Sequence, residues 1–272
     1  MNIMIKTIQL LIILLIINPL QSVAQNKEFT WPNGAKTAIC LTYDDGLDSQ
    51  LDIAIPDLEN ENLKGTFYLT GDFFTPGRID KWKQAARKGH ELGNHTIFHP
   101  CSGSHDFVWE EYKSENYTVR RVVRELSVMN KFLYALDDQE VRSYAYTCGE
   151  TEAGGVSIID SLDASGLFVG ARGLEAGVIK NFRDLNLFNV PSFFEDLDIA
   201  KDMIPVAEEA KEAGGLAVFT FHGVGGDYLE VSREDHYQLL KYLNQNREYY
   251  WTAPFREIVQ HIIKEKKRLG WD

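Results

Sequence analysis

Two adjacent aspartates, Asp44 and Asp45, follow an apolar segment of this 272-residue chain, and three histidines at separate positions complete a set that could do chemistry. His95 and His99 form a His-x-x-x-His pair, and His222 follows a second apolar segment. Neighbouring residues on an extended strand point to opposite sides. We therefore expect the two carboxylates to have different roles, one as a metal ligand and the other in proton transfer.

His95 and His99 are candidate ligands because neutral imidazole nitrogens suit zinc, and two histidines with one carboxylate form a common catalytic zinc site with a position left for water. Such a site makes the bound water a nucleophile near neutral pH. The second carboxylate would accept the water's proton, and His222 would protonate the leaving group. The glycine-rich stretch 223–226 would let a substrate approach, and no Lys-Ser/Thr follows it as in a phosphate loop. The set predicts a zinc-dependent hydrolase.

The composition restricts the partners of this chain. A formal net charge of −12 argues against nucleic acid or an anionic membrane surface as partner. The 12 Tyr, 15 Phe and 5 Trp residues suit a sugar-binding cleft, although most aromatic side chains fill cores.

The N-terminal residues 1–24 have the pattern of a signal peptide. Lys6 precedes an apolar stretch over 8–17, and small residues at 22–24 offer a cleavage site. The stretch is short for a membrane span, although an uncleaved anchor is the alternative. We expect an exported protein, periplasmic or extracellular, with no membrane span after cleavage.

Three cysteines in an exported protein leave at least one unpaired. Cys40 lies inside an apolar run and is expected to be a buried small hydrophobe. Cys101 and Cys148 could form a disulfide if their segments border the same cleft, and the sequence leaves this open.

Strands and helices alternate along the chain, which predicts parallel strands with crossover helices. We expect strands at 37–43, 65–71, 143–148, 167–170, 187–190 and 216–221, and helices at 49–62, 79–88, 119–136, 157–165, 199–213, 232–246 and 254–267. No linker divides residues 25–272, so one domain is expected. The candidate site residues follow apolar runs, at the strand ends where catalytic groups gather in parallel α/β barrels.

Three segments resemble the motifs of a known family. Thr42–Gly46, His95–His99 and Phe221–His222 are similar to the first, second and last motifs of the polysaccharide deacetylases, the NodB-homology superfamily or carbohydrate esterase family four. The resemblance extends over residues 35–264. It implies an α/β fold, a distorted (β/α) barrel with an incomplete set of strands. It also implies hydrolytic removal of acetyl groups from an N- or O-acetylated oligo- or polysaccharide.

The resemblance also implies a role for each matched residue. Asp44 would be the general base and His222 the general acid. A divalent metal, most simply Zn2+, would be held by Asp45, His95 and His99. The backbone N–H of Cys148 would help to stabilise the oxyanion.

The middle motifs depart from the family pattern. Many members have Phe-Arg-Pro-Pro-Tyr-Gly where this chain has Tyr144–Gly149, so Ala145 stands in place of the arginine that steadies the catalytic aspartate. A variant branch with Phe-Ala-Tyr-Pro-Tyr-Gly-like sequences is more similar, and its later Ala-Arg pair corresponds to Ala171 and Arg172. We therefore expect Arg172 to pair with Asp44 from a neighbouring strand. The fourth-motif aspartate that orients the acid histidine has no match.

Other aromatic and histidine residues are open to two interpretations. Trp109, Tyr112 and Tyr117 would form a sugar platform or pack the segment after the second motif. The remaining histidines show no site pattern, and His236 and His261 are expected on helices; they are His90, His105, His236 and His261.

Two rival functions remain from the sequence. The first is hydrolysis of a non-sugar amide on the same fold, and the second is a catalytically silent glycan-binding protein. The presence of all five catalytic-type residues argues against silence, because binding alone does not need them. The sequence leaves open the ester or amide nature of the bond, the glycan, the native metal and the oligomeric state.

Overall fold

A computed structural model describes residues 28–71, 75–194 and 199–271. The predicted signal peptide, residues 1–24, lies outside the described residues. In the described part of the chain, no helix is both long enough and apolar enough to cross a membrane.

The centre of the molecule is a curled sheet in which every paired strand runs parallel to its neighbour. The strand order is β7-β4-β3-β2-β1-β9-β8, and β10 also pairs with β1. The strands are β1 (Thr37–Asp44), β2 (Thr66–Leu69), β3 (Glu91–Asn94), β4 (Tyr144–Ala145), β7 (Ala171–Arg172), β8 (Phe193–Phe194), β9 (Leu216–Phe221) and β10 (Tyr250–Thr252). An isolated bridge between Arg172 and Val190 links β7 to the segment before β8. The expected distorted barrel with an incomplete set of strands is confirmed.

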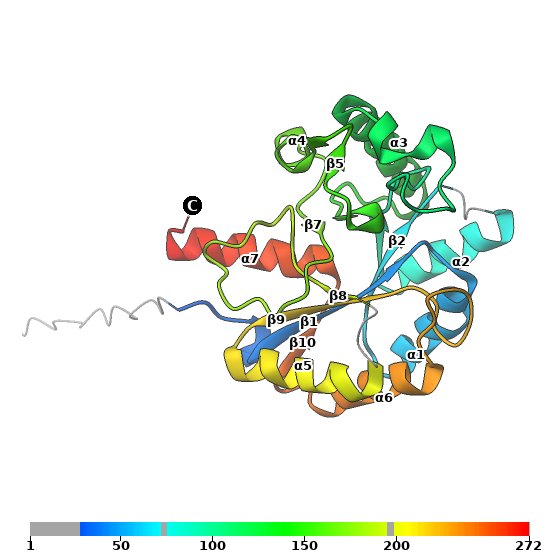
Figure 1. Ribbon diagram of the computed structural model, residues 1–272. Coiled ribbons are helices and arrows are strands. Elements are labelled where there is room, and N and C mark those ends of the chain that lie inside the picture. The colour runs from blue at the N-terminus through cyan, green and yellow to red at the C-terminus, as the bar shows by residue number, and fades with distance from the viewer. Residues whose placement is uncertain (1–27, 72–74, 195–198, 272) are drawn as a thin grey trace, which may run out of the picture.

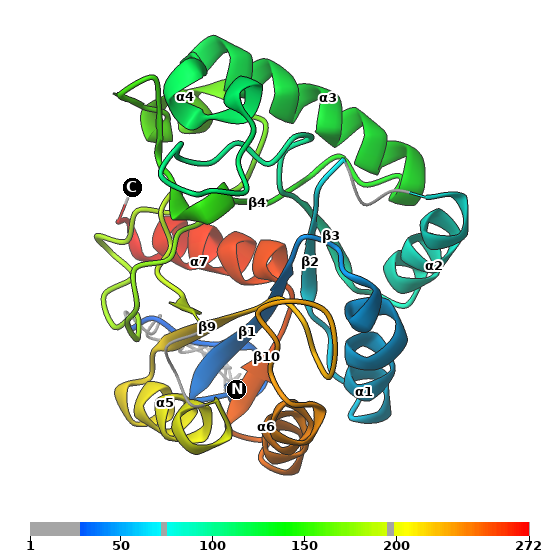
Figure 2. The ribbon, with the colours of Figure 1, turned by 45° about the vertical axis from the view of Figure 1, so that its right-hand side comes forward.

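Helices surround this sheet on its outer sides (Figures 1 and 2). They are α1 (Ile55–Asn60), α2 (Pro76–Arg87), α3 (Val119–Asp137), α4 (Ile159–Ser165), α5 (Ile199–Ala213), α6 (Arg233–Gln245) and α7 (Phe255–Leu269), and a π-helical turn (Gln50–Ala54) precedes α1. In α3 the buried residues Val122, Leu126, Met129 and Leu133 recur at helical spacing. The Thr118 hydroxyl begins this helix by accepting a hydrogen bond from the Arg121 N–H.

Strand β1 is buried along its whole length, which explains why it appears in the sequence as a continuous apolar run. Its residues alternate between two hydrophobic clusters. Ile39, Leu41 and Tyr43 pack with residues of α1, α5 and α6, whereas Ala38 and Cys40 pack with residues of α7. Cys40 is the free, buried cysteine, as expected.

The shortest strands are where the sequence-based expectations fail. The strand expected at 167–170 lies later, at β7, where the pairing with β4 begins at Ala171. Phe168 instead packs its ring against Tyr144, with centroids 5.5 Å apart. The segment expected at 187–190 is not a strand, but it pairs with β7 through the bridge at Val190 and through the Leu187 carbonyl, which accepts from the Ala171 N–H; β8 follows it. Strand β10 and the small antiparallel hairpin of β5 (Glu152–Ala153) and β6 (Val156–Ser157) were not expected. Strands of two or three residues are too short to give a periodic signal.

His236 is a structural residue of α6, so the helix expectation is confirmed. Its Nε2 and the Tyr43 hydroxyl are joined by a hydrogen bond of 2.7 Å, and its ring meets Tyr43 and Phe221 edge-on. The side chain is fully buried, and burial lowers the pKa of His236 to about 4, with Asp57 acting weakly in the opposite direction. The imidazole is therefore neutral in the folded protein at pH 7.

This burial predicts acid sensitivity. Between pH 6.5 and about 4 the unfolded chain binds a proton at His236 that the folded chain excludes, so stability falls as the pH falls through this interval. The full effect is about 3 kcal/mol for one histidine. We expect His236→Gln to lose less unfolding free energy than the parent between pH 7 and pH 4.5, as measured by urea denaturation.

His105→Gln is the matched control, because His105 is exposed. It should leave the pH dependence unchanged. If the unfolding free energies of the parent and of His236→Gln changed equally with pH, the acid sensitivity would not come from His236.

Candidate active site

The carboxyl ends of β1, β3, β7 and β9 bring the expected catalytic and ligating side chains together. Oδ1 of Asp45 lies 3.5 Å from Nε2 of His95 and 3.3 Å from Nε2 of His99. Oδ2 of the same aspartate lies 3.6 Å from Nε2 of His222. Oδ2 of Asp44 lies 3.8 Å from Nε2 of His95. Residues spread over nearly the whole domain thus meet in one place.

Both aspartates face this site, which corrects the expectation that they point to opposite sides. Asp45 has φ 73° and Gly46 φ 67°, so the chain leaves the extended strand geometry at Asp45 and the alternation rule no longer applies. Glycine suits this position because a φ of 67° lies in the left-handed region, which other residues rarely adopt. Each aspartate nevertheless has its own partners, so different roles still follow.

The tautomer of His95 is fixed by its surroundings. Its Nδ1 lies 2.9 Å from the carbonyl oxygen of Ala145. A carbonyl only accepts hydrogen bonds, so Nδ1 carries the proton and Nε2 presents a lone pair toward Asp45. This is the outer hydrogen bond that metal-ligating histidines usually make.

His99 is turned back toward His95 by an unusual loop rather than by a helix. Thr96 and His99 have φ values of 66° and 49°, and the Thr96 hydroxyl accepts a hydrogen bond from the His99 N–H. The carboxylate of Glu125 in α3 accepts hydrogen bonds of 3.0 Å from both backbone N–H groups between these residues, those of Ile97 and Phe98. The two imidazole centroids lie 5.0 Å apart.

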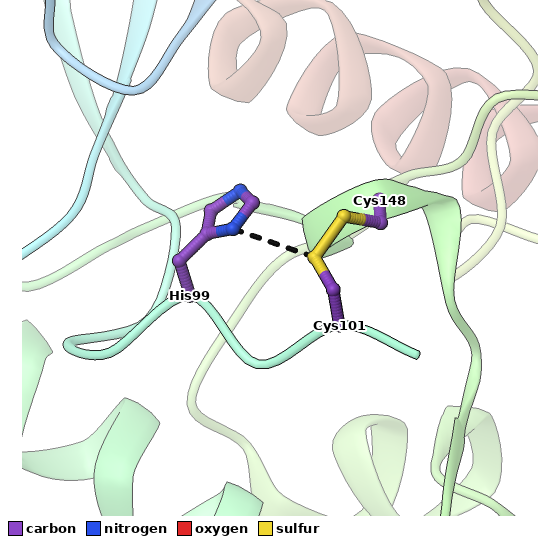
Figure 3. Close-up of side chains that lie close together, drawn as sticks. All are labelled: His99, Cys101 and Cys148. Carbon is purple, nitrogen blue, oxygen red and sulfur yellow. Dashed lines mark hydrogen bonds between the residues drawn. A yellow bond between two sulfur atoms is a disulfide. The ribbon is translucent and has the colours of Figure 1, made fainter. Parts of the chain in front are cut away.

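Figure 3 shows a disulfide beside His99. Cys101 and Cys148 are joined, which settles the pairing that the sequence left open. Nδ1 of His99 lies 3.4 Å from Sγ of Cys101. A disulfide sulfur carries no hydrogen, so Nδ1 is the donor and Nε2 of His99 also presents a lone pair toward Asp45. Cys148 follows β4 in a tight turn with φ 52°.

Arg172 pairs with Asp44, as expected. Its Nη2 donates to Oδ2 of Asp44, and its Nη1 donates to the hydroxyl oxygen of Thr220 at 2.8 Å. The guanidinium is fully buried, and Arg172 is in register with Ala145 on the neighbouring strand. The missing third-motif arginine is thus replaced from the adjacent strand position.

The charges around Asp44 set its protonation. Burial raises the pKa of Asp44, but the opposing effects of Arg172, His95 and His222 together hold it below its usual value. Asp44 is therefore a carboxylate at neutral pH, and its Oδ1 is buried with no hydrogen-bond partner among the described residues.

Gln50 and Tyr228, which sequence reasoning also missed, hold the strand ends and the Asp45 carboxylate in place. The buried side-chain amide of Gln50 donates hydrogen bonds to the backbone carbonyls of Asp44 and His222, and so holds the ends of β1 and β9 together. Tyr228 donates its hydroxyl to Oδ2 of Asp45 at 2.8 Å. Burial and the Asp45 charge raise the pKa of Tyr228, so it remains a donor.

The glycine-rich stretch after His222 forms a tight loop. An added Cβ on Gly223 would lie 2.2 Å from the carbonyl oxygen of Gly226. The Gly223 N–H donates to the carbonyl of Tyr228 at 3.1 Å. The glycine therefore permits the tight loop that returns Tyr228 to Asp45.

The site fits a divalent cation. Oδ1 of Asp45 is buried and accepts no hydrogen bond among the described residues, and it lies within 4.8 Å of the ligating nitrogens of His95 and His99. Burial lowers the pKa of both histidines to about 4, so both are neutral at pH 7. Three lone pairs thus converge with no hydrogen between them. The nearby guanidinium offsets only one of the two carboxylates, so the site keeps a net negative charge that favours a bound cation.

The aromatic residues and histidines that the sequence left open have different surroundings. Trp109 and Tyr112 lie near His99, with stacked rings. Tyr117 is buried under the Arg121 guanidinium, which favours packing over substrate contact. The other histidines lie outside the site; they are His90, His105, His236 and His261.

Gln50, Glu125 and Tyr228 had no motif to reveal them. Only the position of Tyr228, just after the glycine-rich stretch, offered a signal.

Comparison with known proteins identifies related chains. The family model for polysaccharide deacetylases matches residues 32–165. A peptidoglycan-N-acetylglucosamine deacetylase of Bacillus cereus is 39% identical over 70 residues, 24% of this chain and 24% of that protein, so the chain spans about a quarter of this relative's length.

Solved structures show the same fold. A Mycobacterium smegmatis protein attributed to the polysaccharide deacetylases aligns with a TM-score of 0.60 at 16% identity over 87% of this chain and 93% of that one. The catalytic domain of a Eubacterium rectale peptidoglycan N-acetylglucosamine deacetylase aligns with a TM-score of 0.54 at 16% identity, over 84% and 91%. Together with the matched motifs, these findings show that the chain belongs to the polysaccharide deacetylase family.

Proposed function

We propose that this protein is a metal-dependent hydrolase that removes acetyl groups from an acetylated oligo- or polysaccharide. The observation that supports it best is the convergence of Asp44, Asp45, His95, His99 and His222 on one buried spot, with an unsatisfied carboxylate oxygen at its centre. The rival function, a catalytically silent glycan-binding protein, would not require these groups to converge.

Asp45, His95 and His99 would hold the metal, and their nitrogen and oxygen donors suit Zn2+. The bound ion would supply Lewis acidity, acidifying a water molecule and polarising the acetyl carbonyl. Tyr228 would keep Oδ2 of Asp45 occupied, so that Oδ1 is directed at the ion.

Asp44 would act as the general base. Its free Oδ1 would accept a proton from the attacking water while Oδ2 stays bound to Arg172. The guanidinium would keep the carboxylate ionised and fix its orientation, so the base would be ready before substrate binds.

His222 would donate a proton to the departing sugar oxygen or nitrogen as the bond to the acetyl carbon breaks. Gln50 would fix its backbone through the hydrogen bond to the His222 carbonyl. The backbone N–H of Cys148 would donate to the carbonyl oxygen as it gains negative charge. The products are acetate and the deacetylated sugar.

Export, with residues 1–24 as signal peptide and 25–272 as the mature domain, remains part of the proposal. The Cys101–Cys148 disulfide supports it, because disulfides persist mainly in oxidising compartments.

Acetate release tests this function. Purified protein loaded with Zn2+ should release acetate from acetylated xylan or from N-acetylated chitooligosaccharides, and a chelator should abolish release until metal is restored. A panel with non-sugar acetamides separates the rival amide hydrolase. Release from none of these substrates, with or without metal, would contradict the proposal.

The two aspartates should differ in metal content rather than in activity. Asp45→Asn should lose bound metal, because a neutral amide replaces an anionic ligand. Asp44→Asn should keep about one metal ion per chain and lose turnover by roughly 10²–10⁴-fold, as for a general base. Elemental analysis of both purified variants is the measurement. A metal-free Asp44→Asn beside a metal-loaded Asp45→Asn would reverse the assignment.

Arg172→Gln should raise the pKa of Asp44, since burial remains while the main partner of the carboxylate is gone. The acid limb of the kcat/KM profile should therefore move to higher pH. The variant should also lose about 3–5 kcal/mol of stability, because the partner charge stays buried.

Arg142→Gln is a matched control for Arg172→Gln. Arg142 is equally buried and pairs with Asp137, away from the site. It should destabilise the protein without moving the acid limb. An unmoved limb in Arg172→Gln would show that Arg172 has only a structural role.

A further inference from the structure

A hollow of about 440 Å³ lies between the first turns of α3 and the 95–99 loop. Arg120, Arg121 and Arg124 of α3 line it, together with Ile97 and Phe98 of the loop. Three guanidinium groups around one hollow are unexpected on a chain whose formal net charge is −12. The hollow is therefore a local positive site on an acidic protein.

The three arginines share one face of α3, which runs along the outside of the molecule (Figure 2). Arg120 precedes Arg124 by four residues and Arg121 precedes it by three, the spacings at which helix side chains are neighbours. All three residues are exposed. An anion in the hollow can therefore contact more than one guanidinium at the same time.

Two of these charges are not neutralised by the protein itself. Other arginines, such as Arg233 and Arg268, pair with carboxylates at 2.7 Å. Among the described residues, neither Arg120 nor Arg124 forms an ion pair. The chain has 40 acidic residues and does not lack carboxylates, so these two charges are left for a ligand.

Glu125 contributes the one carboxylate among the described residues that line the hollow. It is only 8% exposed, and its Oε1 accepts hydrogen bonds from the N–H groups of Ile97 and Phe98. This carboxylate holds the loop, and its single charge is outweighed by three guanidinium groups.

Arg121 is held in place before any ligand binds. Its guanidinium lies 3.6 Å from the centroid of the Tyr117 ring, and its Nη2 donates to the carbonyl oxygen of Glu111 at 3.1 Å. The other N–H groups of the same guanidinium remain as donors. A cation fixed in this way loses little conformational entropy on binding.

Apolar side chains border the arginines. Phe98 and Val128 are 38% and 48% exposed, and both line the hollow. A guanidinium matches the two oxygens of a carboxylate, and an apolar surface suits the C–H groups of a sugar ring. The combination fits a sugar acid better than a bare phosphate ion.

We propose that this hollow binds the carboxylate of a uronic acid carried by the glycan. The inference rests on the proposed function, because it takes a glycan as the ligand, and it adds that this glycan is acidic. The net charge of −12 would repel a polymer with an acid on every sugar, so the ligand is a mainly neutral glycan with occasional uronate groups. The hollow lies on the α3 side of the loop whose His95 and His99 face Asp45.

Calorimetric binding of unacetylated oligosaccharides tests the inference without requiring catalysis. Two acidic ligands, xylotriose bearing one glucuronate and cellobiouronate, are compared with their neutral counterparts, xylotetraose and cellobiose. We expect the parent to bind at least one acidic ligand about tenfold or more tightly than its counterpart, as for hydrogen bonds to a charged group. The double variant Arg120→Gln/Arg124→Gln should lose this preference. Glutamine has a helix propensity close to that of arginine, so α3 should persist, which circular dichroism checks.

Arg183→Gln/Arg247→Gln is the matched control. Both arginines are exposed, lie outside the lining of the hollow and form no ion pair among the described residues, so the variant removes the same charge. It should keep the preference of the parent. Loss of the preference in both double variants would show an effect of net charge alone and overturn the site.

Two further results would reject the uronate assignment. One is a parent that binds neither acidic ligand more tightly than its neutral counterpart, or a preference that survives in Arg120→Gln/Arg124→Gln. The other is inorganic phosphate that binds as tightly as the acidic oligosaccharides, which would make the hollow a general anion site.

The inference and the proposed function fail separately. Uronate binding that depends on Arg120 and Arg124, in a protein that releases no acetate from any substrate, would uphold the site and reject the deacetylase. Acetate release without any preference for the acidic ligands would do the reverse.

Discussion

The buried pair of Arg172 and Asp44 constrains the shape of the sheet. Strand β7 is separated from β1 by three strands, which in a flat sheet would place the two about 19 Å apart at the usual strand spacing. Their side chains nevertheless form a hydrogen-bonded ion pair. The contact is possible only because the sheet curls, so that the two side chains meet across its concave side. Both charges are buried, so each depends on the other, and losing the curl would leave both without a partner.

The same pair organises the chemistry of the site. One guanidinium beside two carboxylates satisfies Asp44 and leaves Oδ1 of Asp45 among neutral imidazoles. The two adjacent aspartates therefore differ in environment, although they differ by only one position in sequence. Asp44 is bound to the fixed guanidinium of Arg172 and is suited to proton transfer. Oδ1 of Asp45 is instead available to a metal cation that binds from solution. This division arises from partners on β7 and in the 95–99 loop, rather than from strand alternation.

The sequence predicted the parts of the site that are marked by motifs or by long apolar runs. Asp44 and His222 follow strands that the apolar pattern revealed, His95 was found through the His-x-x-x-His motif, and Arg172 was reached through the substitution at Ala145. Other parts depend on tertiary contacts with no local signal. The backbone carbonyls held by Gln50 and the loop N–H groups held by Glu125 become neighbours only after folding. The two-residue strands β4, β7 and β8 are likewise defined by pairing and not by periodicity.

The disulfide links the reacting centre to the aromatic segment of residues 101–117. Cys148 belongs to the turn after β4, where the proposed oxyanion donor lies, and Cys101 begins the aromatic segment. Sγ of Cys101 also accepts the hydrogen bond that orients His99. Side chains on strands are held more precisely than side chains on loops, so the loop that carries His99 gains from a second anchor. The cross-link supplies that anchor, and it acts together with the Glu125 carboxylate, which holds the backbone N–H groups of the 95–99 loop.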